Sequence, residues 1–458
     1  MKVIICGAGQ VGFSIARHLA TENNDVTVIE RSPELIDKLR ASLDVRVVQG
    51  HASHPTMLEQ AGAADADMLI AVTQSDEVNM VACQVGHAVF SVPTKIARIR
   101  AQSYLSPLAA DLFKRENLPI DVIISPEIEV ARAIIRRLEV PGAFDMVPFA
   151  GDRVRIVGIH LAEDCPLVDT PLRHLTELFP NLNTVIVGII RNDRLIVPTG
   201  DDQLLVGDSV YVSVDTPHME RTLAAFGHEE EEARRVLVIG GGNVGFFLAR
   251  EFHRTHPRVN IKIIEQDLAR AEYLSEQLPG VVVLRGDALD TDLLREANVQ
   301  ETQTVVTVSN DDETNVLAAV LAKKEGAQKA ITLTNNTTYA SLAGTLGIDV
   351  FVDPRESTVS SILQHMRRGR IRGLRSLAGG RAEVVEGEAL ETSPLVGKPL
   401  REIRLPDGII IGAIIRNDQV IMPRGATIIE PGDRVVIFAT SERIRKVEEY
   451  FSVRLEFF

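Results

Sequence analysis

The stretch that decides the fold is residues 2–12, KVIICGAGQVG, which returns at residues 235–245 as RVLVIGGGNVG. In both places a run of strand-forming apolar residues leads directly into the spacing G-x-G-x-x-G. The first glycine of such a motif makes a tight turn, the second lets backbone amides approach a pyrophosphate, and the third lets the following helix pack closely against the strand. The sequence therefore predicts a strand, a phosphate-binding loop and a helix start, twice in one chain.

Three further segments are also repeated, in the same order. Gly50-His51-Ala52 recurs as Gly286-Asp287-Ala288, VTQSDEVN at 72–79 recurs as VSNDDETN at 308–315, and GIIRND at 188–193 recurs as AIIRND at 413–418. Self-similarity of this extent is the signature of a repeated structural unit. The chain is therefore interpreted as a tandem duplication.

Within each copy the pattern of apolar and polar residues changes once. Short Val/Ile-rich runs first alternate with longer amphipathic stretches, a pattern typical of parallel strands buried between helices. Shorter β-rich segments interrupted by Pro and Gly follow, and they favour a small α+β domain. The predicted fold class is α/β, a duplicated Rossmann-like doubly wound parallel sheet with a small α+β domain after each copy. The expected domains are 1–140, 141–227, 234–370 and 371–458, with an acidic linker at 228–233.

Composition excludes several protein classes. Of the 458 residues, 45% are hydrophobic and 24% charged, as in ordinary soluble globular proteins. A formal net charge of −14 disfavours nucleic acid as a partner, because an acidic surface repels a phosphate backbone. The sequence contains neither a stretch of about 20 apolar residues nor a signal peptide, so we expect a cytoplasmic protein. Its three cysteines, Cys6, Cys83 and Cys165, lie far apart, which predicts buried thiols and no metal site.

An acidic residue ends the strand that follows each glycine motif. Glu30 lies 23 residues after Gly7, and Glu265 lies 25 residues after Gly240. A carboxylate at this position accepts hydrogen bonds from the ribose of an adenine nucleotide and repels a 2′-phosphate, which disfavours NADP. NAD, ATP and ADP satisfy this contact equally well.

Polar residues at the ends of the other strands extend both candidate sites. Thr73-Gln74 and Ser309-Asn310 follow the fourth strand of each copy, beside the crevice where doubly wound sheets bind ligands. Thr73 and Ser309 are expected to contact phosphate or ribose, or to cap the next helix. His51 and Asp287 end the third strand, where a side chain reaches adenine.

Two arginines distinguish the copies. Arg98 and Arg100 lie on the fifth strand of the first copy, where one guanidinium is expected to point at the phosphates, and the aligned residues of the second copy are Thr332 and Thr334. The first site is therefore expected to bind polyphosphate more strongly. The alternative for Arg100 is a surface residue at the sheet edge. The candidate nucleotide-binding residues are Gly7, Ala8, Gly9, Gln10, Val11, Glu30, His51, Ala52, Thr73, Gln74 and Arg98 in the first copy, and Gly240, Gly241, Gly242, Asn243, Val244, Glu265, Asp287, Ala288 and Ser309 in the second.

Sequence signatures of catalysis are missing. The chain has no Tyr-x-x-x-Lys pair, no GxSxG elbow and no GxxxxGK[ST] loop. Paired nucleotide sites without catalytic groups favour a sensor, with no catalytic and no metal-binding residues. The alternatives are a soluble NAD-dependent oxidoreductase and an oligomeric scaffold in which the nucleotide is structural.

Two charge runs have a simple interpretation. Glu229–Glu232 is predicted to be a solvated linker between the halves. Five arginines between Arg367 and Arg375 form a basic run in an acidic protein. A solvated helix end is favoured for this run over a contact with an anion or a partner.

The order of these motifs resembles the RCK (KTN) regulatory domains of potassium channels and transporters. The resemblance rests on the glycine motif, the acidic strand end, Gly-His/Asp-Ala, Asp-Glu-x-Asn and the Ile-Arg-Asn-Asp segment of the small domain, and it covers essentially the whole chain. It implies binding of NAD(H) and/or ATP/ADP in the Rossmann-like domains. It also implies a homotetramer that forms a ring on the cytoplasmic face of an integral membrane potassium channel or transporter. His51, where the family usually has Asp, and Thr332, which replaces an arginine, depart from the family pattern.

Overall fold

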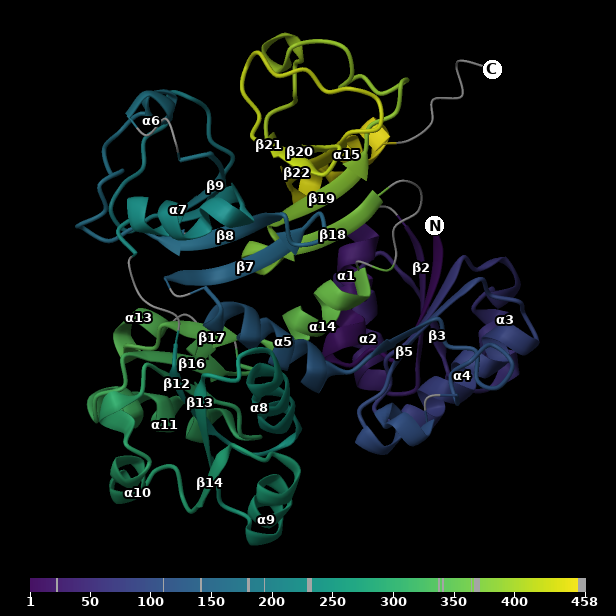
Figure 1. Ribbon diagram of the computed structural model, residues 1–458. Coiled ribbons are helices and arrows are strands. Elements are labelled where there is room, and N and C mark those ends of the chain that lie inside the picture. The colour runs from purple at the N-terminus through teal and green to yellow at the C-terminus, as the bar shows by residue number, and fades with distance from the viewer. Residues whose placement is uncertain are drawn as a thin grey trace. The chain divides into compact units, whose positions relative to one another are not determined.

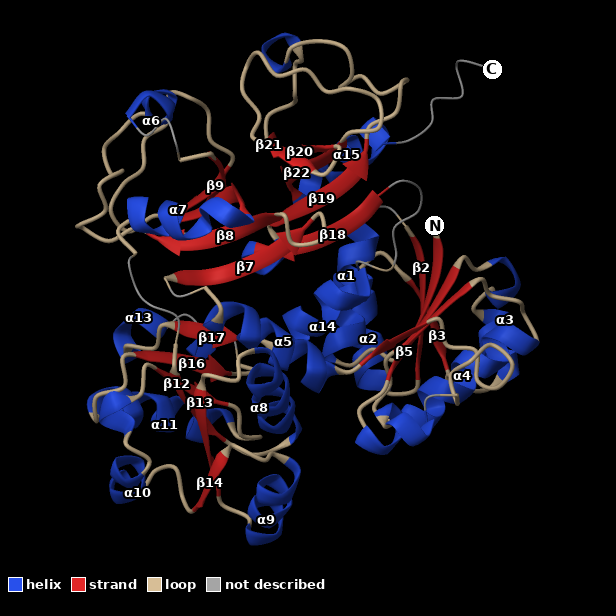
Figure 2. Cartoon of the chain, in the orientation of Figure 1, coloured by secondary structure: helices blue, strands red, loops and turns tan. Residues whose placement is uncertain are grey.

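The architecture comes from a computed structural model, which describes residues 1–21, 24–109, 111–140, 142–178, 182–192, 194–228, 233–336, 338–339, 342–363, 365 and 371–451. Four sheets are formed in these ranges (Figure 2). The two six-stranded sheets belong to one compact unit and the two five-stranded sheets to another. Within the same ranges no helix is long and apolar enough to cross a membrane.

The first six-stranded sheet is parallel and has the strand order β3-β2-β1-β4-β5-β6. This order, with its reversal between β1 and β4, is that of a Rossmann fold and places the ligand crevice at the carboxyl ends of those two strands. The elements are β1 (Lys2–Cys6), α1 (Gln10–Thr21), β2 (Asp25–Glu30), α2 (Pro33–Ser42), β3 (Arg46–Gln49), α3 (Pro55–Gln60), β4 (Met68–Ala71), α4 (Asp76–Ala88), β5 (Thr94–Arg98), β6 (Val122–Ile124) and α5 (Pro126–Leu138).

The second six-stranded sheet repeats this order as β14-β13-β12-β15-β16-β17. Its elements are β12 (Arg235–Ile239), α8 (Asn243–Thr255), β13 (Asn260–Glu265), α9 (Leu268–Gln277), β14 (Val282–Arg285), α10 (Thr291–Glu296), β15 (Thr304–Thr307), α11 (Asp312–Lys324), β16 (Lys329–Leu333), α13 (Ala343–Leu346), β17 (Val350–Val352) and α14 (Pro354–Leu363) (Figure 1). Helix α14 packs against α1 of the first copy, inside the same compact unit. The predicted duplication of a doubly wound parallel sheet is confirmed.

Close packing of helix on strand explains the glycine spacing. Gly7 and Gly240 both have φ 101°, a backbone conformation that side chains disfavour. A Cβ atom on Gly12 would lie 1.9 Å from the carbonyl oxygen of Gly7, and one on Gly245 would lie 2.1 Å from that of Gly240. A Cβ atom on Gly9, by contrast, meets nothing within 4 Å. The outer glycines are therefore required by the fold, and the middle one is left open toward the ligand side.

The small domains are antiparallel and also repeat. The first sheet has the order β10-β9-β11-β8-β7 and the second the order β18-β19-β22-β20-β21, which is the same arrangement listed from the opposite edge. The elements of the first are β7 (Ala143–Phe149), β8 (Val154–His160), α6 (Leu172–Leu178), β9 (Thr184–Arg191), β10 (Arg194–Ile196), β11 (Ser209–Asp215) and α7 (Met219–Ala225). Those of the second are β18 (Ile371–Leu377), β19 (Ala382–Glu388), β20 (Ile409–Arg416), β21 (Gln419–Ile421), β22 (Arg434–Thr440) and α15 (Ile444–Phe451).

The two small domains share one hydrophobic core, in which side chains of β11 and β22 meet. The Tyr211 and Phe438 rings lie 6.2 Å apart, and the Tyr211 hydroxyl accepts a hydrogen bond from the backbone N–H of Ala378 at 3.2 Å. The backbone N–H of Ala150 donates to the buried Glu386 carboxylate at 2.9 Å. The duplicated small domains are therefore paired by packing and by buried polar contacts.

The Ile-Arg-Asn-Asp segments join antiparallel strands as hairpins. Asn192 and Asn417 have φ 50° and 49°, as turns between tightly connected strands require; Asp193 lies outside the described residues. The preceding arginines also have a structural role. Arg191 donates two hydrogen bonds to buried Asp208 (2.8 and 2.7 Å), and Arg416 does the same with Asp433 (2.9 and 2.7 Å).

The remaining expectations concern the cysteines, the charge runs and the boundaries. All three cysteines are buried, and burial raises the pKa of the Cys6 thiol to about 12, which makes it unreactive. Glu229–Glu232 and residues 367–370 of the basic run lie outside the described residues. The domain boundaries stay predictions.

The glycine geometry predicts a contrast in stability. Gly12→Ala is expected to destabilise the protein by about 1–3 kcal/mol, because the new methyl group meets a backbone carbonyl that cannot move aside. Gly9→Ala enters open space and should change stability little. Thermal unfolding followed by circular dichroism measures both, and an equal loss for the two variants would contradict this packing argument.

Candidate nucleotide-binding sites

Each glycine loop is held by the acidic residue that ends the next strand. The Glu30 carboxylate accepts hydrogen bonds from the backbone N–H of Ala8 at 2.6 Å, Arg31 at 2.8 Å and Ser32 at 2.9 Å. In the second copy, Glu265 accepts from Gly241 at 2.7 Å and Asp267 at 2.9 Å. The carboxylates therefore order the loops that would bind phosphates. They also lie beside the position expected for a ribose.

The loops lead into helix N-termini whose amides favour anions. Gly242 is the N-cap of α8 and makes no side-chain cap hydrogen bond, since it has no side chain. Gly9 and Gln10 are exposed where α1 begins. Backbone N–H groups at a helix start carry partial positive charge, so each loop is suited to a phosphate.

The asparagine of the Asp-Glu-x-Asn motif joins two strand ends. Fully buried Asn79 accepts from the backbone N–H of Thr73 at 2.8 Å and donates to the carbonyl of Arg98 at 2.9 Å. Asn315 accepts from Ser309 N–H at 2.8 Å and donates to Leu333 O at 3.1 Å. This residue fixes the backbone that borders each crevice, so its role in the motif is structural.

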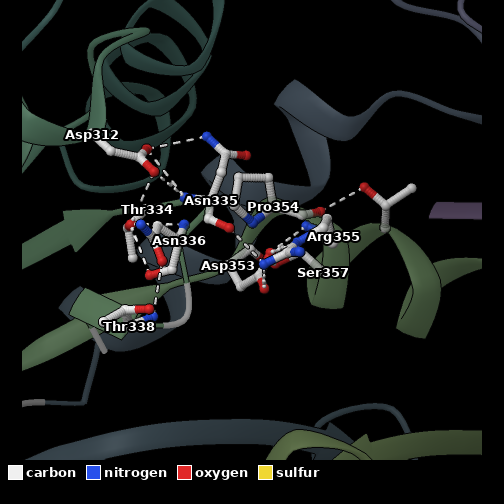
Figure 3. Close-up of polar contacts among 10 residues, drawn as sticks. Asp312, Thr334, Asn335, Asn336, Thr338, Asp353, Pro354, Arg355 and Ser357 are labelled. Atoms are coloured by element: carbon white, nitrogen blue, oxygen red, sulfur yellow. Dashed lines mark hydrogen bonds and ion pairs between the residues drawn. The ribbon is translucent and has the colours of Figure 1, made fainter. Parts of the chain in front are cut away.

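The aspartate of the same motif holds the chain that leaves the fifth strand. Asp312 accepts from Asn335 N–H at 2.9 Å and from the Thr334 hydroxyl at 3.2 Å, while Arg355 donates to Asn335 O at 2.6 Å (Figure 3). In the first copy Asp76 accepts from the backbone N–H groups of Arg100 at 2.9 Å and Ala101 at 2.7 Å. The backbone of Arg100 is therefore fixed.

The alternative role for Thr73 and Ser309 as helix caps is wrong. The N-caps are Ser75 for α4 and Asp311 for α11, because their side chains reach the N–H groups of Val78 and Thr314. The Thr73 hydroxyl instead donates to Asn79 Oδ1 at 2.7 Å. Thr73 and Ser309 are half-buried, and Gln74 is exposed.

The residues expected on the adenine side have different contacts in the two copies. His51 Nδ1 lies 2.9 Å from the Ser53 hydroxyl, and its ring is 4.9 Å from that of His54. Asp287 accepts from the backbone N–H of Leu289 at 2.9 Å and lines the cavity of the second copy, which is described below. Ala52 and Ala288 are buried, so they contribute packing more than side-chain contacts.

The two arginines of the first copy have different environments. The Arg98 guanidinium donates to the carbonyl of Thr73 at 2.7 Å, and its Nε atom is buried with no partner among the described residues. Burial lowers the pKa of Arg98 from its usual value. Strand β5 ends at Arg98, so Arg100 lies just beyond it and not on it as expected, with its Nε 3.2 Å from Glu127.

A cavity of about 590 Å³ lies over the second glycine motif. Among the predicted residues, its lining includes Gly240, Gly242, Asn243, Val244, Glu265, Asp287, Ala288 and Ser309. Gly241 is absent from the lining. A cavity of this size is typical of small-molecule sites.

Sequence reasoning missed Arg270, which lines the same cavity. Its Nε donates to Gly241 O at 2.7 Å, its guanidinium lies 4.9 Å from the centre of the Tyr273 ring, and its Nη2 atom has no partner among the described residues. The first copy has Leu35 at the aligned position, since both residues lie three positions after the N-cap of their helix. The sequence feature that could have identified Arg270 is its position as a cation shortly after the acidic strand end.

Three kinds of comparison bear on these sites. The chain matches the sequence model of the TrkA-N domain over residues 3–126 and 236–354, and that of the TrkA-C domain over residues 156–227 and 384–452. It is 51% identical to the Trk system potassium uptake protein TrkA of Azorhizobium caulinodans over the full length of both chains. It is 41% identical to the protein of the same name from Halomonas elongata, again over both full chains.

Solved structures agree on the fold. The crystal structure of the GsuK RCK domain superimposes with a TM-score of 0.59 at 18% identity, covering 99% of this chain and 95% of the other. The GsuK channel bound to NAD gives 0.58 at 18% identity, covering 99% of this chain and 79% of the other. The sequence-based expectation of tandem RCK-type domains is confirmed.

Aspartate at the middle glycine should block each site separately. Gly9→Asp and Gly242→Asp both place a side chain where a Cβ meets nothing within 4 Å. The new carboxylate caps the helix and occupies the place of a phosphate, so we expect the fold to persist while that site loses nucleotide. Calorimetric titration with ADP should detect one fewer site in each variant; unchanged stoichiometry would contradict the placement of the phosphates.

Arg270 is expected to contribute to binding at the second site. Arg270→Leu introduces the residue found at this position in the first copy. In the Gly9→Asp protein, where only the second site remains, it should weaken ADP binding about tenfold, because a charge-assisted hydrogen bond to the ligand is lost. The control is Arg250→Leu, because the guanidinium carbons of Arg250 and Arg270 lie 5.2 and 5.7 Å from the centre of the Phe246 ring, but Arg250 is outside the cavity lining. If both substitutions changed the ADP affinity measured by titration equally, the role of Arg270 would be packing alone.

Proposed function

Because this chain belongs to the family of Trk system potassium uptake proteins TrkA, we propose that it is the nucleotide-sensing regulatory subunit of a Trk-type potassium channel or transporter. The observation that carries the proposal is the pair of glycine loops, each held by a glutamate and each opening a helix. Two such loops in one chain favour ligand sensing over a structural nucleotide or an oxidoreductase.

The proposed ligands are NAD(H) and/or ATP/ADP. The glutamates at the ribose position favour nucleotides without a 2′-phosphate. The GsuK channel bound to NAD, which shares this fold, supports a dinucleotide ligand. The half-buried Arg98 guanidinium beside Thr73 supports a polyphosphate at the first site.

Regulation is proposed to act through differential binding. A ligand shifts a conformational equilibrium only if its affinities for the two conformations differ. Nucleotides that favour different angles between Rossmann and small domains would supply that difference, and a coupling free energy of about 1–3 kcal/mol gives a useful response. The shared core of the paired small domains supports their movement as one body.

The proposed assembly is a homotetramer, giving eight RCK units in a ring. It lies on the cytoplasmic face of the membrane, attached through an integral membrane potassium channel or transporter subunit. A closed ring of identical chains is a common form of oligomer. Nucleic acid is no partner in this proposal, in keeping with the net charge of −14.

The test is potassium flux through the partner channel reconstituted in vesicles with this protein. We expect flux to differ among saturating ATP, ADP and NADH, and NADPH to act weakly. Gly9→Asp and Gly242→Asp should each remove part of the difference, because each blocks one site.

Three results would contradict the proposal. Identical flux with ATP, ADP and NADH would exclude gating by these nucleotides. Rapid NADH consumption with a carbonyl substrate would favour the oxidoreductase. Nucleotide that exchanges only on unfolding would favour the scaffold.

A further inference from the structure

The second cavity combines an anion-binding loop with an acidic wall. Its charged lining residues are the acids Glu127, Glu265, Asp267 and Asp287 and the bases Arg100 and Arg270. A nucleotide di- or triphosphate adds several negative charges, so it binds only where cations offset that field. The two arginines are therefore the groups on which binding of a polyphosphate at this site depends.

The second copy has no cation at the carboxyl end of its own fifth strand, because Lys329 lies at the opposite end of that strand. Thr332 stands where the first copy has Arg98, and it is fully buried. Thr334 stands where the first copy has Arg100, and its hydroxyl is bonded to Asp312. Arg270 comes from the helix that follows the acidic strand end, and its Nε donates to Gly241 O in the glycine loop. The other arginine of the cavity lining is Arg100, from the first copy.

Arg98 and Arg100 belong to the same chain segment but have different neighbours. Arg98 donates to Thr73 O in the first copy, whereas Arg100 lines the cavity of the second, inside the compact unit that holds both Rossmann domains. Side chains two residues apart in an extended strand lie on the same face. The alternation of side chains along a strand therefore does not explain why Arg98 and Arg100 have different neighbours. The difference arises because Asp76 holds the backbone of Arg100 and Ala101 beyond the end of β5.

The Arg100 side chain is available to a ligand. Its Nε contacts Glu127 at 3.2 Å, its side chain is 55% exposed, and no hydrogen bond from its terminal nitrogens is found among the described residues. A guanidinium held at one nitrogen and open at the other two is suited to bidentate binding of a phosphate.

We propose that Arg100 of the first copy is a phosphate ligand of the second nucleotide site, which makes that site composite and selective for adenosine di- or triphosphate. This inference rests on the proposed function, because it assigns a residue to one of its two sites. Each site then has one strand-end arginine: the first takes Arg98 from its own sheet, and the second takes Arg100 from the neighbouring copy.

The experiment uses the full-length Gly9→Asp protein, in which the second site remains. Arg100→Gln should weaken ADP binding about tenfold in calorimetric titration and leave adenosine binding unchanged, because only the phosphates lose a partner. Arg100→Lys should retain part of the affinity. The control is Arg295→Gln, since Arg295 is similarly exposed and paired with a glutamate but does not line the cavity.

The reciprocal experiment uses Gly242→Asp, in which the first site remains. Here Arg98→Gln should weaken ADP binding, and Arg100→Gln should not. Unchanged ADP affinity of Arg100→Gln in the Gly9→Asp protein, or equal losses for ADP and adenosine, would overturn the inference while leaving the proposed function intact. ADP binding to the wild type that disappears in Gly9→Asp would overturn it too. A wild-type protein that binds neither ADP, ATP nor NADH would overturn both.

Discussion

The hydrogen bond between a strand-end carboxylate and a glycine-loop amide is the contact on which both sites depend. Glu30 accepts from Ala8 N–H at 2.6 Å, and Glu265 accepts from Gly241 N–H at 2.7 Å. Each bond joins the first βα turn to the neighbouring strand before any ligand is present. The loop amides are therefore ordered toward the phosphate position in advance, which lowers the entropy cost of binding.

A second set of buried polar groups joins the ends of the fourth and fifth strands. Asn79 and Asn315 each bond to the backbone at both of these strand ends, and their burial makes an unpaired partner costly. These bonds explain why Asp-Glu-x-Asn recurs in both copies although none of its residues needs to touch a ligand. The motif maintains the geometry, and the residues around it determine the chemistry.

Duplication gives two sites that share a backbone and differ in charge. The first has Arg98 and His51, whereas the second has Asp287 and Arg270 at its cavity and a buried Thr332 in place of Arg98. Equal folds with unequal charges allow one chain to respond to two ligands or to two concentrations of the same ligand. The paired small domains are joined through Tyr211 and Glu386, and the proposed regulation would act on them as one body.

The sequence by itself determined the duplicated α/β fold, the glycine loops, the acidic strand ends and the helix starts at Asp76 and Asp312. These features depend on local backbone requirements, such as φ 101° at Gly7 and the absence of a Cβ at Gly12, and such requirements can be recognised from residue type alone. Only the tertiary structure decided that Ser75 and Asp311 are the caps, that Arg270 and Arg100 line the second cavity, and that the small domains share a core. Those outcomes depend on side-chain direction and on contacts between residues far apart in the chain, which spacing along a sequence does not encode.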